Sequence, residues 1–107
     1  MEYLPFRIAG RDFVVDASRV RAIVPFKGPE HHSAVPLIDL RKKLGLPPIF
    51  FGRRPLLVVL DLAGFAVDYV SDSISGSAKD CRRGKLRPAG GRSKWVLDPD
   101  SLVIRCP

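Results

Sequence analysis

Apolar and polar residues alternate in two successive runs near the start of the chain. Leu4, Phe6 and Ile8 alternate with Tyr3, Pro5 and Arg7, and the same pattern returns at Phe13, Val15 and Ala17. A period of two indicates a strand with one buried face. The tight turn Ala9-Gly10-Arg11 between the runs predicts an antiparallel hairpin. Val20 to Val24 predicts a third strand, entered through a short helical turn near Ser18 to Val20.

The middle of the chain holds the one helical pattern. Asp39 follows the apolar run Val35 to Ile38 and is a good N-cap for a helix that carries Leu40 and Leu44 on one face. Gly45 and Pro47 end it. We expect Arg41, Lys42 and Lys43 to point outward near the helix C-terminus, where cations offset the negative end of the helix dipole.

The second half of the chain predicts more strands. Leu56 to Leu60 is apolar throughout, and Phe65 to Val70 alternates after the turn residues Leu62-Ala63-Gly64, so the two runs predict a second hairpin. Lys94 to Leu97 predicts a last strand, and Asp98-Pro99 predicts a closing helical turn with the acid as its N-cap. Short strands with Gly and Pro turns and almost no helix predict an all-β fold with one small barrel or a pair of them.

Length and composition indicate a single domain over residues 1–107. With 46% hydrophobic residues the chain can bury a core without metals or disulfides. No apolar run approaches the length of about 20 residues that a membrane-spanning helix needs. The start, Met1-Glu2-Tyr3, shows no secretory signal, so we expect a cytoplasmic protein. Cys81 and Cys106 lack the spacing of metal or redox sites and are expected to be free thiols.

The net charge of +7 is concentrated in residues 79–94. This segment holds seven of the 18 Lys and Arg residues and one acid, so the rest of the chain has a net charge of only +1. Its Gly, Pro and Ser content predicts a flexible basic loop. The loop is either a solvated surface or a tether for an acidic surface or phosphate backbone. The polyanion-binding residues of the second hypothesis are Arg82, Arg83, Lys85, Arg87, Arg92 and Lys94.

A search for catalytic or metal-binding patterns returns little. His31 and His32 are adjacent, so in an extended chain they project to opposite sides and share a metal poorly. The run LLVVLDLAG, residues 56–64, resembles a GTPase switch strand, but the chain has no phosphate-binding G-x-x-x-x-G-K-[ST] loop. Asp61, Asp68 and Asp72 are interpreted as strand-edge and turn residues. We therefore predict no enzyme activity, no cofactor, no metal and no small-molecule substrate.

The order of these features resembles the CheW-like domain of bacterial chemotaxis coupling proteins and of the regulatory domain of their histidine kinases. The first hairpin and third strand are similar to the family pattern at Phe6, Ile8, Gly10, Phe13, Val20 and Ile23. VPLIDLRKKLGLP, residues 35–47, resembles the central family signature, and Val67-Asp68-x-Val70 resembles the strand pair that follows it. WVLDPDSLV, residues 95–103, is similar to the closing turn.

The resemblance implies two small intertwined SH3-like β-barrels and a non-catalytic adaptor. Its partners would be the histidine kinase regulatory domain and the chemoreceptor cytoplasmic tip, and nucleic acid is the less favoured partner. The chain departs from the family in one place. In the family an Arg-Gly segment precedes the central signature, whereas here Glu30 to Ala34 leads directly into Val35 without it. A sheet edge exposed there would allow a homo-oligomer.

An adaptor needs exposed apolar residues beside charged ones, because an interface combines a desolvated anchor with complementary charge. The cluster Ile49-Phe50-Phe51, after Pro47-Pro48, has neither helical nor strand periodicity. It either packs between the barrels or binds a partner. The predicted partner-binding residues are Ile49, Phe50, Phe51, Arg41 and Lys42.

Overall fold

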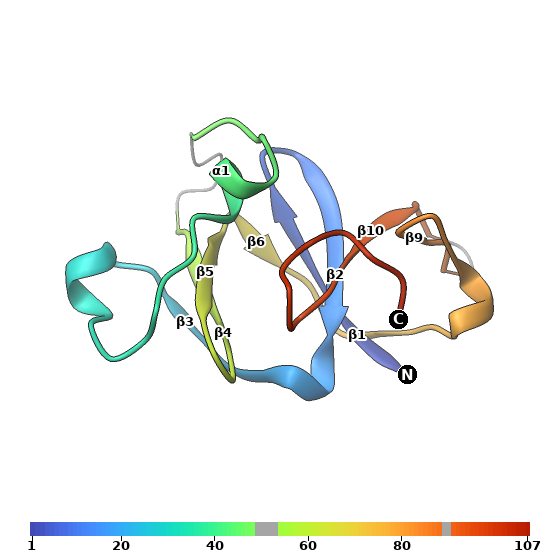
Figure 1. Ribbon diagram of the computed structural model, residues 1–107, viewed down its shortest axis with the longest axis horizontal. Coiled ribbons are helices and arrows are strands. Elements are labelled where there is room, and N and C mark those ends of the chain that lie inside the picture. Colours follow the sequence, from blue (N-terminus) through green and yellow to red (C-terminus); the bar gives the residue numbers. More distant parts are fainter. Residues whose placement is uncertain (49–53, 89–90) are drawn as a thin grey trace.

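β1 (Glu2–Ile8) and β2 (Arg11–Asp16) form the hairpin that the alternation predicts. The computed structural model describes residues 1–48, 54–88 and 91–107 (Figure 1). The other strands are β3 (Val20–Pro25), β4 (Leu56–Leu60), β5 (Gly64–Val67), β6 (Tyr69–Val70), β7 (Ile74–Ser75), β8 (Cys81–Arg82), β9 (Lys85–Leu86) and β10 (Lys94–Leu97). The α-helix is α1 (Leu40–Lys43), and 3₁₀ turns cover Ala17–Arg19, Pro29–His31 and Ala78–Asp80. The third strand, its preceding helical turn and the short central helix are therefore confirmed.

The strands form two sheets. The larger sheet has the order β6-β1-β2-β10-β9-β8, with β7 also paired to β1, and the smaller sheet has the order β3-β4-β5. β10 runs parallel to β2, and the other pairs are antiparallel. The mostly β fold with one short helix is confirmed. Within the described part of the chain, however, neither sheet closes into a barrel of the predicted kind.

The turn between β1 and β2 shows how local sequence directs this hairpin. Ile8 pairs with Arg11, so the loop has two residues, and both have positive φ (Ala9 53°, Gly10 76°). Two central residues of positive φ define a type I′ turn, whose twist matches that of the flanking strands. Glycine adopts this conformation without strain, whereas Ala9 adopts it at a cost.

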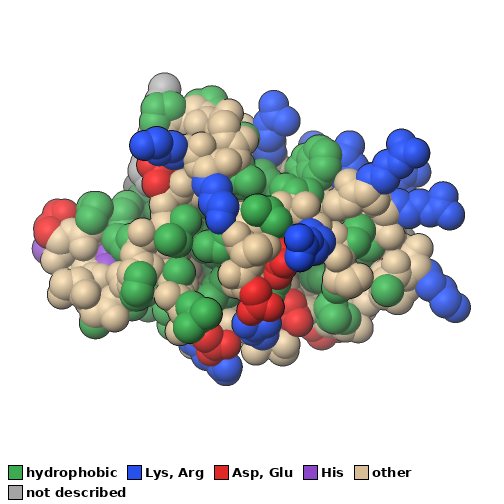
Figure 2. Space-filling view, in the orientation of Figure 1, with side chains coloured by type: hydrophobic (Ala, Val, Ile, Leu, Met, Phe, Trp, Pro, Cys, Tyr) green, Lys and Arg blue, Asp and Glu red, His purple; other side chains and the backbone are tan. Residues whose placement is uncertain are grey.

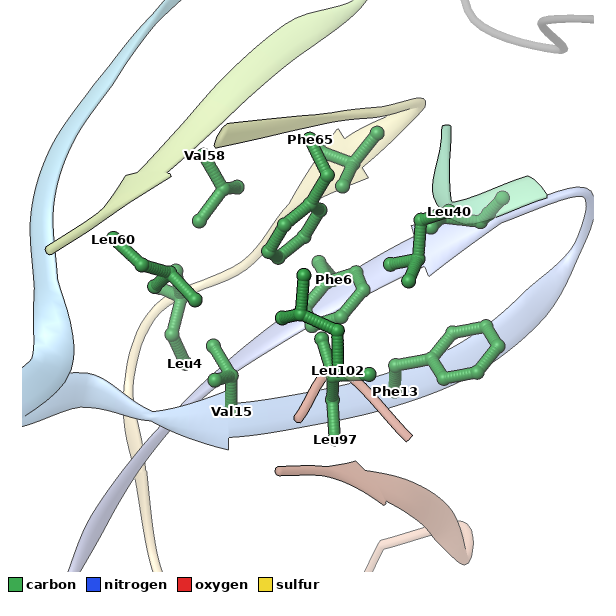
Figure 3. Close-up of a cluster of buried hydrophobic side chains, with 12 residues drawn as sticks. Leu4, Phe6, Phe13, Val15, Leu40, Val58, Leu60, Phe65, Leu97 and Leu102 are labelled. Carbon is green, nitrogen blue, oxygen red and sulfur yellow. The ribbon is translucent and has the colours of Figure 1, made fainter. Parts of the chain in front are cut away.

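The main core lies between the two sheets. Phe6 of β1 lies 5.4 Å from Phe13 of β2 and 5.4 Å from Phe65 of β5, measured between ring centroids. Figure 3 shows these rings pointing toward a shared interior with Leu40 of α1 and Leu97 of β10. The core-facing residues predicted for the first hairpin are thus confirmed, and Phe6 links the two sheets.

A second cluster covers the opposite face of the first hairpin. It consists of Tyr3, Val14, Cys81, Leu86 and Val96, of which Val14 and Leu86 are completely buried. The alternation predicts that Tyr3 and Val14 face outward, and this prediction is wrong. The reason is tertiary, because β8 and β9 fold back over that face.

The two cysteines are joined, contrary to the expectation of free thiols. Cys81 in β8 forms a disulfide with Cys106, which ties the C-terminal segment to the larger sheet. The basic segment is also more regular than the predicted loop. Cys81 pairs with Leu86 and Arg82 with Lys85, around a two-residue turn in which Arg83 and Gly84 have φ of 51° and 80°. We call residues 81–86 the basic hairpin.

The second predicted hairpin is confirmed over β4 and β5, but the predicted strand from Phe65 to Val70 is interrupted. β5 ends at Val67 in the smaller sheet, and β6 begins at Tyr69 in the larger sheet. Asp68 is the residue at which the chain crosses from one sheet to the other. Its backbone N–H donates to the carbonyl of Arg7 at 2.9 Å, which anchors the crossing on β1.

Candidate functional site

A buried ion pair lies at the junction of the two sheets and α1. Arg41 Nη2 lies 2.6 Å from Asp68 Oδ1, and each side chain is only 6% exposed. The prediction that Arg41 points outward with its lysine neighbours is therefore wrong. Charged side chains are rarely this buried unless they are paired. Arg41 and Asp68 hold α1 against the crossing between β5 and β6.

The second oxygen of Asp68 stabilises the strained turn of the first hairpin. Asp68 Oδ2 accepts a hydrogen bond of 2.8 Å from the backbone N–H of Ala9, the residue of positive φ. With one oxygen on Arg41 and the other on Ala9, this carboxylate has structural partners on both sides. The geometry indicates a structural role for Asp68.

The N-cap of α1 forms as the sequence predicts. Asp39 Oδ1 accepts a hydrogen bond from the backbone N–H of Lys42 at 3.1 Å, which satisfies one of the unpaired donors at the start of the helix. Leu40 is buried in the main core, whereas Lys42 and Lys43 are exposed. The cap and the buried pair therefore fix which face of α1 reaches solvent.

An apolar hollow of about 490 Å³ lies on the other face of the smaller sheet. Leu57 of β4 and Ala66 of β5 are cross-strand partners at its floor. The remaining lining residues come from the segment between β3 and α1, from α1 itself and from the chain after it: Phe26, Pro29, Leu37, Ile38, Asp39, Leu40, Arg41 and Pro48. Pockets of this size and apolar lining are typical binding sites.

Two of the predicted partner-binding residues differ in their exposure to solvent. Lys42 is exposed on α1, next to the segment that lines the hollow, whereas Arg41 is buried. Ile49, Phe50 and Phe51 lie outside the described residues. Sequence reasoning did not find the hollow, because its lining residues come from segments that are far apart in the chain.

The histidines and acidic residues offer little chemistry. The ring of His32 stacks on Phe26 with centroids 5.5 Å apart, and His31 lies 3.6 Å from Glu30. Within residues 1–48, 54–88 and 91–107, no three His, Cys, Asp or Glu side chains gather as a metal site would require. Across those same residues, the helices are too short or too polar to cross a membrane.

Comparison with known proteins now decides the family. The family model described as CheW-like domain matches residues 2–103, which is nearly the whole chain. The chain belongs to the CheW-like domain family. A crystal structure of the scaffolding protein TtCheW from Thermoanaerobacter tengcongensis superposes with a TM-score of 0.68 at 16% identity, covering 89% of this chain and 86% of that one. No curated protein sequence matches the chain.

Surface charges of this CheW-like domain fall into two groups. Around the first hairpin and β3, arginines have acidic partners: Arg7 with Asp12 at 2.8 Å, Arg19 with Asp100 at 2.5 Å, and Arg21 with Asp61. The hydrogen bond from Arg21 is the main cause that lowers the pKa of Asp61. Among the described residues, no ion pair involves Lys79, Arg82, Arg83, Lys85 or Arg87.

The other two basic residues of the predicted polyanion set differ from the hairpin cations. Arg92 lies 3.8 Å from Asp12, and Lys94 donates to the carbonyl of Arg92 at 3.0 Å. Within the described part of the chain, residues 79–87 of this CheW-like domain thus hold a run of five cations that form no ion pair.

The sequence contains one signal of the buried pair. Asp68 interrupts the run from Phe65 to Val70, and all the remaining residues of this run are hydrophobic. An acid in such a run requires a buried partner, because an unpaired charge is costly to bury. The sequence does not say which of the 18 Lys and Arg residues supplies that partner.

Proposed function

We propose that this CheW-like domain is a non-catalytic adaptor of a chemotaxis-type signalling pathway, coupling chemoreceptors to a histidine kinase through protein contacts. The observation that carries the proposal is the family match over residues 2–103. The fold shared with a CheW scaffolding protein and the structural roles of Arg41, Asp68 and Asp39 support it.

The apolar hollow and the exposed Lys42 are the contact surface that we propose for one of these partners. Desolvated apolar anchors beside a charged residue provide the physical basis of a specific interface. Arg41 serves this surface indirectly, because its pairing with Asp68 fixes the orientation of α1. Ile49, Phe50 and Phe51 stay a prediction.

Binding measurements test the adaptor role. Purified protein is titrated by calorimetry with a histidine kinase regulatory domain and with a receptor signalling tip, and we expect saturable binding to at least one. Failure with both removes the pathway assignment and leaves the fold unaffected. Ala66→Leu, which fills the hollow, is expected to weaken binding about tenfold, the effect of a lost apolar anchor.

The matched control for that variant is Ala22→Leu. Ala22 is exposed on β3 in the same sheet, so the substitution adds the same side chain outside the hollow. Equal affinities of the two variants would contradict the assignment of the hollow. Circular dichroism and thermal unfolding of both variants show whether they stay folded.

The alternative predicted from the sequence is binding of nucleic acid through residues 79–94. Electrostatic binding to phosphates weakens steeply as salt rises, because counterions are released on binding. A titration with mixed DNA and RNA at low and high salt therefore tests it. The absence of binding at low salt would eliminate this alternative.

A homo-oligomer also stays a prediction. β3 is an edge strand of the smaller sheet, and its Ile23 is 40% exposed. Exposed edge strands can pair with a second chain. Light scattering coupled to size exclusion measures the oligomeric state directly.

A further inference from the structure

The basic hairpin and β10 together present a cationic face with one aromatic residue. Lys85 lies directly opposite Arg82 on the neighbouring strand β8 and opposite Trp95 on β10. These three side chains therefore share one face of the larger sheet. Cys81 and Leu86 occupy the other face and are buried. Lys85 Nζ lies 4.4 Å from the centroid of the Trp95 ring, which is a cation–π contact.

The cations of this face repel one another. Arg82 and Lys85 are direct cross-strand neighbours of like charge, an arrangement that disfavours folding. Within the described part of the chain neither forms an ion pair, in contrast to Arg7, Arg19 and Arg21. In Figure 2 the Lys and Arg side chains at the end of the molecule that carries β9 project into solvent. Because Arg82 and Lys85 contribute no ion pair to the fold of the described residues, their charges are available to bind an external anion.

An apolar hollow adjoins the same face. It has a volume of about 200 Å³ and is lined by Phe13, Trp95, Ile104, Leu44, Leu46 and Arg11. Arg11 and Phe13 lie two residues apart on β2, and Phe13 pairs with Trp95, so the hollow continues the face that carries Lys85. An engineered apolar cavity of about 150 Å³ accepts benzene, so this hollow has room for one large apolar side chain.

We propose that this face binds an acidic segment of another protein, which places one Leu or Phe side chain in the hollow. Arg82, Lys85 and Arg11 would pair with carboxylates that flank the apolar residue. Complementary charge around a desolvated anchor is the arrangement that gives protein interfaces their specificity. The proposal goes beyond the adaptor role, because it requires neither a receptor nor a kinase.

Two observations favour a protein segment over a nucleic acid. A phosphate backbone would satisfy the cations but has no aliphatic side chain with which to fill the hollow. Base stacking would need a free aromatic face, and Lys85 lies over the ring of Trp95.

Trp95 is the only tryptophan in the chain, so its fluorescence reports on this face directly. The probe is a short acetylated and amidated peptide of Glu and Asp residues with one central Leu, titrated at low salt. A second peptide has Ala in place of Leu. We expect saturable quenching or enhancement by the Leu peptide and about tenfold weaker binding of the Ala peptide, since burying a Leu side chain contributes at least this much. Equal binding of the two peptides overturns the role of the hollow.

Two protein variants distinguish binding at this face from nonspecific electrostatic attraction to the whole protein. Arg82→Glu is expected to weaken binding of the Leu peptide about tenfold or more through loss and reversal of charge. Lys27→Glu changes the charge equally at an exposed position near the smaller sheet and is expected to have little effect. Equal effects of the two variants overturn the proposal. Tighter binding of duplex DNA than of the Leu peptide at the same salt also overturns it, in favour of a nucleic-acid site.

Discussion

Two clusters of basic residues in this domain have opposite relations to the fold. On α1, Arg41 is buried and paired with Asp68 at 2.6 Å, and this pair holds the helix at the junction of the two sheets. On the basic hairpin, Arg82, Arg83 and Lys85 are exposed and no ion pair is found for them in the described residues. Both clusters are runs of Lys and Arg in the sequence. The comparison teaches that a buried cation is a structural element, whereas an exposed and unpaired cation is available for binding.

The largest effect is expected at the buried pair. Asp68→Ala leaves the Arg41 charge without this carboxylate and the Ala9 N–H without its acceptor, so we expect a loss of about 3–5 kcal/mol in the free energy of unfolding. Urea denaturation measures it. The double variant Arg41→Met/Asp68→Leu is the control, and it should be more stable than Asp68→Ala because no charge is buried. A loss below about 1 kcal/mol for Asp68→Ala would mean that the pair is not structural.

The disulfide decides whether the basic hairpin is held to the domain. Cys81→Ser/Cys106→Ser is expected to lose about 2–4 kcal/mol of unfolding free energy, because the bond closes a loop of 25 residues. Thermal unfolding with and without dithiothreitol checks this. The reductant should lower the Tm of the wild-type protein and leave the double variant unchanged. A wild-type Tm that does not respond to reductant would show that the thiols are free, as the spacing first predicted.

The helix cap should have an intermediate effect. Asp39→Ala removes the acceptor of the Lys42 N–H and is expected to cost about 1 kcal/mol. Asp39→Ser is the matched control, because serine also caps helices and should retain most of the stability. Chemical denaturation of the three proteins gives the values. An equal loss in Ala and Ser variants would assign the effect to something other than capping.

Acid should weaken the closing turn through Asp98. The backbone N–H of Asp100 and the hydroxyl of Ser101 hydrogen-bond its carboxylate and lower the pKa of Asp98. A carboxyl whose pKa is lowered on folding stabilises the native state above its unfolded-state pKa, and this contribution disappears as the pH falls through the folded-state pKa. Denaturation at pH 7 and in the acid range should show a smaller pH dependence for Asp98→Asn than for the wild type. Identical pH dependence would contradict the assignment.

The smallest effect on stability is expected on the basic hairpin. Arg82→Gln should change the unfolding free energy by no more than about 0.5 kcal/mol, and in the stabilising direction, because it removes a like-charge cross-strand pair. Arg7→Gln is the control, since Arg7 is exposed but paired with Asp12. If Arg82→Gln destabilises the domain by more than about 1 kcal/mol, the hairpin cations belong to the fold and the contrast with Arg41 fails.

Several elements could be predicted from local sequence because local physics governs them. The first hairpin follows from alternation and a two-residue turn, and the start of α1 follows from the N-cap Asp39. The apolar run of β4 likewise predicts a buried strand. In each case the predictive features lie within a few residues or depend only on which face is apolar, although Asp68 later adds a long-range hydrogen bond to the hairpin turn.

Most of the failures concern long-range contacts. The sequence predicts that Arg41 points into solvent with Lys42 and Lys43, but its partner Asp68 lies 27 residues away. The disulfide joins residues 25 positions apart, and neither cysteine lies in a known motif. The hollow near α1 brings together Phe26, Leu57 and Ala66. Nothing in the local pattern specifies such pairs.

By itself the sequence determined the strands β1 to β4 and β10, the helix cap, the resemblance to a family and the location of the excess charge, because periodicity, turn chemistry and composition act over short distances. Only the tertiary structure decided which charges are buried, which face of the first hairpin is covered, and where apolar surface stays open beside cations. These outcomes depend on which segments meet after the two sheets have packed, and the free energy of each contact then depends on its partner.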